Sequence, residues 1–389
     1  MHIINPLIAL GKTGSYSISI LFPAPSAGHA GQVKAYLKQY PGFTNIAGVI
    51  YRGETPNPTG VREHIPDGAA YLLGSSGYRE ALKQMLGEND FDIVVVETSF
   101  MLWTLALIRD MQPNAKVVLD LQNAEHLLLR RMAEQGGLSA ENRVKYLQEY
   151  KKTLDWEKKH WPLVDACMAV SPLEAEIYKK YAPGVPVEVV VAGGGVEAKR
   201  ASGNNNQLVT PFDIAFVGTM WYPNVHGLTW FLREVFPGVR NHFPQSRLHI
   251  VGSGKPPQSL VGAVRNNQSV VFWGQLEDER SVIGGAGVFV VPLFIGAGSR
   301  IKIMTAWSLG LPVVSTAIGA EGLSFKKGLD ILIADTPSDF SGCVMGLLAD
   351  SSLRRMLSLN GKRQFEALYS REVASQKVIR FFNSMVSNY

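Results

Sequence analysis

Short apolar runs alternate with longer amphipathic stretches along the whole chain. Runs of about 4–8 apolar and β-branched residues are typical of strands buried in a parallel sheet, and apolar residues three or four positions apart are typical of the helices that cover it. The pattern therefore predicts an α/β fold with parallel sheets. Strands are expected at Ser17–Phe22, Ile46–Tyr51, Asp92–Glu97, Lys116–Asp120, Ala166–Val170, Val187–Val191, Phe212–Val217, Arg247–Val251, Ser269–Trp273, Val288–Val291, Pro312–Thr316 and Asp330–Ile333.

A polar, glycine-rich stretch divides this pattern into two halves. Residues Ala192–Gln207 read AGGGVEAKRASGNNNQ, a composition typical of a linker. A chain of 389 residues also exceeds what one hydrophobic core usually supports. We therefore predict two Rossmann-like domains of similar size, at residues 1–195 and 208–369, and a C-terminal helix at 370–389 that returns to the first domain. The first residues, Met1–Tyr16, have no clear place in the pattern.

The composition is that of a soluble globular protein, with 46% hydrophobic and 18% charged residues. No apolar run reaches the roughly 18–20 residues of a membrane span, and the start of the chain lacks the charged and apolar regions of a secretory signal. The two cysteines, Cys167 and Cys343, lie far apart and form no disulfide framework or metal-binding spacing. These features favour a cytoplasmic location.

A modest excess of positive charge narrows the class of partners. The chain has 38 Lys and Arg residues against 33 acidic ones, which gives a net charge of +5 and favours anionic partners. The cations are scattered and form no basic stripe with interleaved aromatic residues, so we do not expect nucleic acid as a partner. A phosphorylated small molecule and peripheral contact with the inner membrane face both remain open.

The most informative segment is Phe289–Thr316, which reads as a buried strand, a glycine-rich loop, an amphipathic helix and a second buried strand. The small residues Gly296–Ser299 let a ligand approach the backbone, and Arg300 and Lys302 lie where the helix presents unpaired N–H groups. This pattern predicts an anion site. Because Lys302 and Thr305 are three residues apart, they share a helix face along which a bound group can extend. A solvated turn with two surface cations is the alternative.

Glycines also follow the first predicted strand of each half. The segment Pro23–Gly31 contains Gly28 and precedes a helix expected from Gln32, so this loop could approach a phosphate. A flexible Pro/Gly turn is the other interpretation of the segment.

Gly218 and Thr219 follow the first strand of the second half, before a helix expected from about Val225. Backbone N–H groups in such a loop can contact a diphosphate. A tight turn without a ligand is the alternative interpretation at these two residues.

Four polar side chains cluster after the fourth predicted strand. Asp120, Gln122, Asn123 and Glu125 lie where a strand ends and a helix begins, and they can exchange protons and hydrogen bonds with a substrate. We predict an acceptor-side catalytic site there. A helix cap formed by Asn123 or Asp120, with Glu125 in the first turn, is equally compatible with the sequence.

The sequence contains no convincing metal or cofactor motif. Asp90 and Asp92 form a DxD, but they precede a strand and so lie at the wrong edge of the sheet. Gly252–Gly254 lacks the third glycine of a dinucleotide loop, which leaves little support for a nicotinamide-dependent oxidoreductase. We expect no metal and no cofactor. The run Glu149–Trp161 is predicted to be a solvated helix face, with contact to a membrane surface as the alternative.

Several blocks of the second half occur in one order over about a hundred residues, and together they resemble bacterial retaining glycosyltransferases of the GT-B fold, in the group 4 family. The blocks are FVGTMWYPNVHGLTWF at Phe216–Phe231, RLHIVGSG at Arg247–Gly254, VVFWGQLED at Val270–Asp278, VPLFIGAGSRIKI at Val291–Ile303 and GLPVVSTAIGAEGL at Gly310–Leu323. In the first half, VVLDLQNAEHLLLRR at Val117–Arg131 resembles the family's D-x-H-N-x-E segment.

The resemblance implies two Rossmann-like domains that face each other across a cleft, and transfer of a sugar from a nucleotide-diphosphate donor to a hydroxyl acceptor with retention of configuration. It implies no metal, because cations and helix ends stabilise the leaving group. Acceptors in this fold range from lipid-linked saccharides to metabolites and proteins. The donor contacts implied are Gly218, Thr219, Arg300 and Lys302 at the diphosphate, Gly296, Gly298 and Ser299 at the sugar, Thr305 at the ribose, and Trp273 to Leu276 at the base.

Three positions depart from the family pattern. The family commonly has two glutamates eight residues apart, where this chain has Ala297 and Thr305, and its usual histidine is Gln122 here. Loss of a carboxylate that accepts ribose hydroxyls costs about 1–3 kcal/mol in binding. A degenerate, non-catalytic subunit or binding scaffold is therefore the alternative to an active enzyme.

Overall fold

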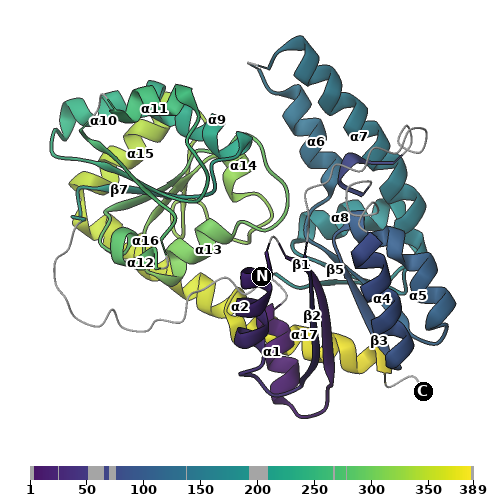
Figure 1. Cartoon of the computed structure of the whole chain (residues 1–389). Helices are drawn as coiled ribbons and strands as arrows, with labels where there is room; N and C mark the ends of the chain where they lie inside the picture. Colours follow the sequence, from purple (N-terminus) through teal and green to yellow (C-terminus); the bar gives the residue numbers. More distant parts are fainter. Residues whose placement is uncertain are drawn as a thin grey trace. The chain divides into compact units, whose positions relative to one another are not determined.

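The computed structural model describes residues 4–24, 26–50, 65–69, 76–136, 138–191, 209–265, 268–276 and 278–386. The chain divides into two compact units (Figure 1). The first comprises Met1–Gly193, Ala297–Ser299 and Arg371–Tyr389, and the second comprises Gly194–Gly296 and Arg300–Ser370. All twelve predicted strands are present in the described ranges, each within three residues of its expected bounds. The predicted linker, Ala192–Gln207, lies outside the described residues.

The first unit contains two parallel sheets. One pairs β1 (Ile18–Ala24) with β2 (Phe43–Ile50), and the other has the order β3 (Ile93–Glu97), β4 (Lys116–Leu121), β5 (Ala166–Ala169) and β6 (Val187–Val189). The helices are α1 (Ile4–Lys12), α2 (Ala27–Leu37), α4 (Ser76–Glu88), η1 (Ser99–Thr104), α5 (Leu105–Met111), α6 (Glu125–Glu134), α7 (Ala140–His160), η2 (Trp161–Leu163), α8 (Pro172–Tyr181) and α17 (Arg371–Val386).

Strand β4 supplies both faces of the four-stranded sheet with apolar side chains. Val117, Leu119 and Leu121 pack in one cluster of buried residues, whereas Val118 packs in a second cluster with Phe382 of α17. Side chains of a strand point alternately to opposite faces, so a strand covered on both sides must be apolar at every position. This explains why β4 is a continuous apolar run up to Asp120.

The start of the chain, which had no predicted place, forms helix α1. Figure 1 shows α17, in yellow, beside α1, in purple, and the two helices are in contact. Leu10 of α1 is buried in the same cluster as Val378 and Phe382 of α17. The sequence pattern missed this pairing because the apolar partner lies at the far end of the chain.

Helix α2 begins earlier than predicted. Ser26 caps it, because the Ser26 side chain accepts a hydrogen bond from the backbone N–H of His29 at 3.2 Å. The prediction of a loop as far as Gly31 is therefore wrong, and Gly28 lies in the first helical turn. A serine cap can offset the low helix propensity of nearby glycines.

The second unit contains one six-stranded parallel sheet. Its order is β12 (Leu332–Ile333), β11 (Val313–Ser315), β10 (Val288–Val291), β7 (Ile214–Val217), β8 (Leu248–Val251) and β9 (Val270–Gly274). The helices are α9 (Tyr222–Trp230), η3 (Phe231–Val235), α10 (Phe236–His242), α11 (Gln258–Arg265), α12 (Arg280–Ile283), α13 (Ile301–Ser308), α14 (Ala317–Ala320), α15 (Pro337–Ala349) and α16 (Ser351–Leu368).

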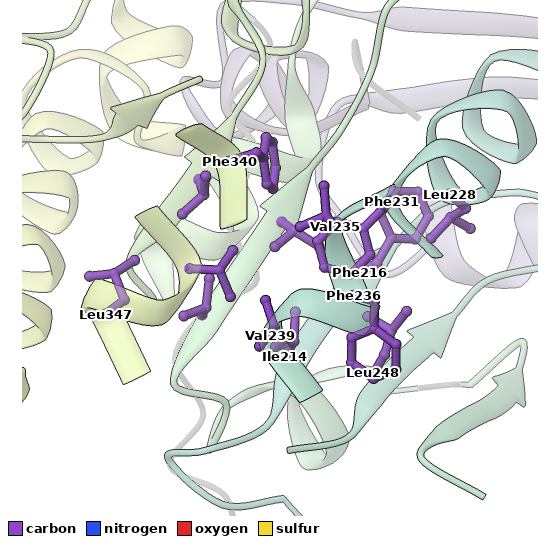
Figure 2. Packing of buried hydrophobic residues seen from close by; sticks show 14 of the residues in the cluster. Ile214, Phe216, Leu228, Phe231, Val235, Phe236, Val239, Leu248, Phe340 and Leu347 are labelled. Carbon is purple, nitrogen blue, oxygen red and sulfur yellow. The ribbon is translucent and has the colours of Figure 1, made fainter. Parts of the chain in front are cut away.

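One buried cluster joins this sheet to helices on one face (Figure 2). Ile214 and Phe216 of β7 pack in it with Phe231 and with Phe340 of α15. The rings of Phe231 and Phe340 meet edge to face with centroids 5.8 Å apart, an arrangement that aromatic pairs favour. The cluster anchors β7, the strand that leads to Gly218.

Helix α9 starts at Tyr222, three residues before the predicted start near Val225. Pro223 is compatible with this start because proline has no N–H to lose in the first turn of a helix. The earlier start places Asn224 in the first turn of α9, close to the end of β7.

No helix within the described ranges is both long enough and apolar enough to cross a bilayer.

Gly361 on α16 should tolerate no side chain, in contrast to Gly346 on α15. A Cβ at Gly361 would lie 2.4 Å from Cδ1 of Trp307, whose Nε1 donates to the Asp330 carbonyl at 3.1 Å, whereas a Cβ at Gly346 would meet nothing within 4 Å. We expect Gly361→Ala to lower the free energy of unfolding by about 1–3 kcal/mol. Gly346→Ala should raise it by roughly 0.5–1 kcal/mol through helix propensity.

Urea denaturation of both variants measures the difference. Equal stability of the two variants would show that Trp307 can move aside.

Candidate functional site

In the second unit, the carboxyl ends of β7, β8 and β9 are held together by their backbones. The N–H of Gly218 donates to the Val251 carbonyl at 2.9 Å, and the N–H of Gly252 donates to the Gly274 carbonyl at 2.9 Å. A Cβ on Gly252 would lie 1.9 Å from the oxygen of Gly218, so only glycine allows this approach. Parallel sheets bind ligands beyond this edge.

Lys302, in the first turn of α13, is held beside this edge. Its Nζ donates to Oδ1 of Asn224 at 2.7 Å and lies 4.6 Å from the ring centroid of Phe216. The Nδ2 of Asn224 donates to the Thr219 carbonyl at 2.8 Å, which fixes the orientation of the amide. Burial, and then the positive charge of Arg300, lower the pKa of Lys302 to about 7. The amine is thus partly neutral at pH 7, and a nearby anion would favour its charged form.

Arg300 precedes α13 at its N-cap position and is 6% exposed. Its Nη2 lies 3.4 Å from Oε2 of Glu321. A Cβ on Gly296 would lie 2.8 Å from Nη1 of Arg300, so the guanidinium group packs against the backbone of that glycine. Two cations at the start of one helix form an environment that favours negative charge.

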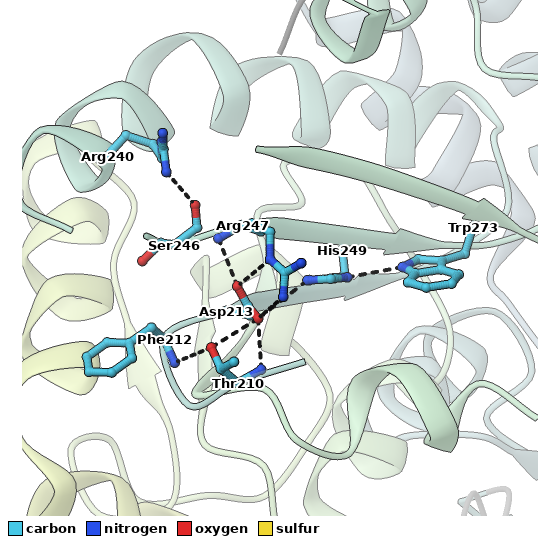
Figure 3. Close-up of polar contacts among 8 residues, drawn as sticks. All are labelled: Thr210, Phe212, Asp213, Arg240, Ser246, Arg247, His249 and Trp273. Atoms are coloured by element: carbon cyan, nitrogen blue, oxygen red, sulfur yellow. Dashed lines mark hydrogen bonds and ion pairs between the residues drawn. The ribbon is translucent and has the colours of Figure 1, made fainter. Parts of the chain in front are cut away.

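The residues predicted to contact ribose and base lie in the same unit. Thr305 is buried on α13, one turn after Lys302. The indole Nε1 of Trp273 donates to Nδ1 of His249 at 3.1 Å (Figure 3). Leu276 is half-buried just beyond the end of β9. The roles of these residues toward a nucleotide stay predictions.

In the first unit, Asp120 lies in β4 with a second carboxylate beside it. In the parallel register of the sheet, Asp120 pairs with Glu97 of β3. Nε2 of Gln122 donates to Oδ2 of Asp120 at 2.7 Å. Burial, and then the charge of Glu97, raise the pKa of Asp120 to about 8, although the Gln122 hydrogen bond opposes the shift. Asp120 is therefore largely a neutral carboxylic acid at pH 7.

Glu125 lies in the first turn of α6. Nδ2 of Asn123 donates to its Oε1 at 3.2 Å. Burial raises the pKa of Glu125 to about 7; the Asn123 hydrogen bond opposes the shift, and the charge of Glu157 adds to it. The alternative prediction of a cap by Asn123 or Asp120 is wrong, because the N-cap residue is Ala124 and no side chain caps the helix, although its placement of Glu125 in the first turn is confirmed.

Glu157 of α7 belongs to the same cluster and was not predicted. It is 0% exposed, accepts the backbone N–H of Glu125 at 3.0 Å, and pairs through Oε2 with Nδ1 of His126. The prediction of a solvated helix face is therefore wrong at this position. Thr153 and Trp156 of α7 are also buried, so Glu157 completes a buried stripe at i, i+3 and i+4, and this spacing was the signal in the sequence.

A strained residue follows the unpredicted carboxylate Glu97. Among the described residues, Thr98 is the only one other than glycine with a positive φ, which is 71°. Its N–H donates to the Asp120 carbonyl at 3.0 Å. Such conformations persist where the surrounding structure imposes them and are frequent at functional sites.

The glycine-rich loop before α13 is divided between the units. Residues Ala297–Ser299 cluster with the first unit, whereas Gly296 belongs to the second. Gly298 has φ of 75°, and its N–H donates to Oε1 of Glu174 at 2.7 Å. A sugar contact by Gly296, Gly298 and Ser299 stays a prediction.

A cavity of about 490 Å³ opens elsewhere in the first unit, between η1, α5 and the end of α7, and its lining is mainly apolar. None of the predicted site residues lines it. Among the described residues, no group of three or more His, Cys, Asp or Glu side chains could hold a metal ion.

Most of the second unit is similar to a known protein family. Residues 211–350 match the family model "Glycosyl transferases group 1". The chain is 28% identical over 155 residues to the "Uncharacterized 44.6 kDa protein in cps region" of Klebsiella pneumoniae. That match spans 38% of this chain and 40% of the relative, which is less than two thirds of the relative's length.

Solved structures similar to this one include a glycosyltransferase from Rickettsia africae ESF-5, with a TM-score of 0.68, 11% identity and coverage of 100% of this chain and 95% of that one. Anabaena HepE in complex with UDP and glucose gives a TM-score of 0.63, 13% identity and coverage of 98% and 95%. Sucrose-phosphate synthase from Thermosynechococcus elongatus gives 0.63, 18% identity and coverage of 82% and 79%. These likenesses confirm the predicted GT-B fold.

The raised pKa of Asp120 makes the stability of the first unit depend on pH. The folded protein binds this proton up to about pH 8, whereas the unfolded chain releases it near pH 4. The stabilisation is thus fully present below about pH 4 and is lost as the pH rises through 8. The Asp120→Asn variant has a side chain of the same shape that cannot ionise. The free energy of unfolding of the wild type should therefore fall relative to that of the variant as the pH rises from 4 to 8.

Urea unfolding of both proteins at pH 5 and pH 8.5 measures the effect. As a control, Glu97→Gln removes the neighbouring charge and should reduce the pH dependence. Identical pH profiles for wild type and Asp120→Asn would refute the assignment.

Proposed function

We propose that the protein transfers a sugar from a nucleotide-diphosphate donor to a hydroxyl group of an acceptor. The premise is that residues 211–350 match the model of group 1 glycosyltransferases and that the chain has the GT-B fold. The observation that carries the proposal is the pair of cations at the start of α13. Lys302 and Arg300 lie there together, and Lys302 is linked through Asn224 to the loop at Gly218 and Thr219.

The chemistry of this edge suits a diphosphate leaving group. When the bond to the sugar breaks, negative charge grows on the phosphate oxygen, and fixed cations lower the energy of that state. Arg300 and Lys302 supply charge, and the N–H groups at the start of α13 add dipoles. On this proposal the reaction is independent of a metal ion, because protein cations neutralise the leaving group.

UDP-sugars are the first donors to test. The structurally similar HepE was solved with UDP and glucose and also with UDP-glucose. In our proposal the base lies against Trp273 to Leu276, the ribose lies near Thr305, and a hexosyl group faces Gly296, Gly298 and Ser299. Gly28, in the first turn of α2, adds a donor contact from the first unit.

The first unit would bind the acceptor. The neutral carboxyl group of Asp120 can donate a hydrogen bond at pH 7, and Glu125 is poised near its pKa, so the pair can orient an acceptor hydroxyl with Gln122 and Asn123. We propose retention of configuration, as in the group 4 family, with the leaving phosphate taking the acceptor proton. A lipid-linked saccharide is one acceptor class, which would bring a cytoplasmic protein into peripheral contact with the inner membrane face.

A second candidate is a degenerate subunit that binds without turnover. It is favoured by Ala297, Thr305 and Gln122, which stand where the family usually has two glutamates and a histidine. If the wild type binds nucleotide without transferring or hydrolysing sugar, and Thr305→Glu restores turnover, this second candidate is correct.

Removal of either cation should weaken nucleotide binding. Hydrogen bonds to charged groups contribute roughly 1.5–3 kcal/mol, so we expect Arg300→Ala and Lys302→Ala each to weaken UDP binding about tenfold or more in calorimetry. Lys362→Ala, at an exposed cation of α16 in the same unit, is the matched control and should bind UDP as the wild type does. UDP binding that neither site substitution weakens would exclude the proposed diphosphate site.

Nucleotide binding should also be coupled to the uptake of a proton by the protein. Lys302 has a pKa of about 7 in the free protein, so at pH 8 most of it is neutral, and a bound diphosphate will raise that pKa. We therefore expect proton uptake when UDP binds at pH 8, measured by calorimetry in buffers of different ionisation enthalpy. Lys302→Arg stays charged at this pH and should abolish the uptake. Uptake that persists in this variant would assign the proton to another group.

A further inference from the structure

Four polar side chains of the second unit follow one another from residues just before β7 and β8 to the end of β9 (Figure 3). The indole Nε1 of Trp273 donates to Nδ1 of His249 at 3.1 Å. Nε2 of His249 faces Oδ2 of Asp213 at 3.6 Å, and Nη2 of Arg247 lies 3.0 Å from the same oxygen. His249 is 1% exposed and Asp213 is 0% exposed, so these two side chains are removed from water.

The partners define the tautomer of His249. An indole N–H can only donate, so Nδ1 of His249 must accept, and the ring proton lies on Nε2, facing Asp213. Burial alone would raise the pKa of Asp213. Hydrogen bonds from Arg247 and nearby backbone N–H groups, together with the nearby Nε2 of His249, instead hold that pKa well below its usual value, so Asp213 is a carboxylate that faces the imidazole.

Trp273 lies near the end of β9, where a contact with His249 can fix its side chain. Among the described strands, β9 lies at the edge of the sheet and pairs with β8. His249 pairs with Val271, and Trp273 is the extra residue of a bulge two residues further along, because Ile250 pairs with Phe272 and Val251 with Gly274. The two rings are stacked with an interplanar angle of 19°. The hydrogen bond from Trp273 to His249 therefore ties the side chain at the end of β9 to β8.

We propose that His249 is a positioning residue for nucleotide recognition, which fixes the Trp273 indole and thereby the end of β9 against the base. This inference rests on the proposed function, because that function places the base at Trp273 to Leu276. Trp273 is half-buried. The chain of Asp213, His249 and Trp273 then acts at the base end of the nucleotide, whereas Arg300 and Lys302 act at the phosphate end.

Two substitutions of His249 separate its hydrogen bonds from its volume. His249→Gln supplies an acceptor and a donor, so it can keep both neighbours without ionising. His249→Leu supplies neither. We expect His249→Leu to weaken UDP binding roughly fivefold or more, while binding of inorganic pyrophosphate stays within about twofold of the wild type. His249→Gln should restore UDP binding to near the wild-type value.

A double-mutant cycle tests whether His249 acts through Trp273. Trp273→Phe keeps an aromatic ring but removes the N–H, and its half-buried position makes it the safer variant if His249→Leu does not fold. Alone, it should weaken UDP binding and spare pyrophosphate binding. In the double variant, His249→Leu should add little to the effect of Trp273→Phe, because the hydrogen bond is already absent.

The outcomes are distinguishable from those for the proposed function. If the wild-type protein binds neither UDP nor pyrophosphate, the proposed diphosphate site fails, and this inference fails with it. If the wild type binds both but His249→Leu weakens them equally, or leaves UDP binding unchanged, the positioning role alone is overturned. Strict additivity of the His249 and Trp273 substitutions would overturn it as well.

Discussion

The withdrawal of ionisable groups from water at the carboxyl ends of parallel strands is the constraint on which the rest of this structure depends. A charge in a poorly hydrated place is costly unless it is paired, and otherwise the group shifts its pKa toward the neutral form. Both units show this response. Asp120 at the end of β4 is shifted upward to about 8, and Lys302 near the end of β7 is shifted downward to about 7.

The buried ionisable groups have different neighbours in the two units. In the first unit, side-chain amides donate hydrogen bonds to the buried carboxyl groups of Asp120 and Glu125, and neighbouring carboxylates raise their pKa values. Asp120 and Glu125 can therefore exchange protons near neutral pH. In the second unit, the Asn224 amide and the Phe216 ring hold Lys302, and no carboxylate among the described residues pairs with it. A phosphate can therefore approach this amine without first displacing an acidic partner.

The sequence predicted the elements of this arrangement better than its contacts. Each strand was visible because a strand covered on both faces must be apolar throughout, and the cations before and within α13 were visible from their place after a glycine-rich loop. Glu157, Glu97 and His249 were missed because their importance comes from neighbours that are distant along the chain. Helix α1 was missed for the same reason, since its apolar partners lie on α17.

The sequence by itself determined the α/β class, the strands, the GT-B fold through its ordered motifs, and the candidate residues at the strand ends, because hydrophobic periodicity and glycine placement are local properties. Only the tertiary structure decided which of these residues are buried, which amide holds Lys302, and which ring nitrogen of His249 carries the proton. Burial and hydrogen-bond pairing depend on segments brought together by folding. No local pattern contains that information, and it is what sets the pKa of a side chain and so its chemistry.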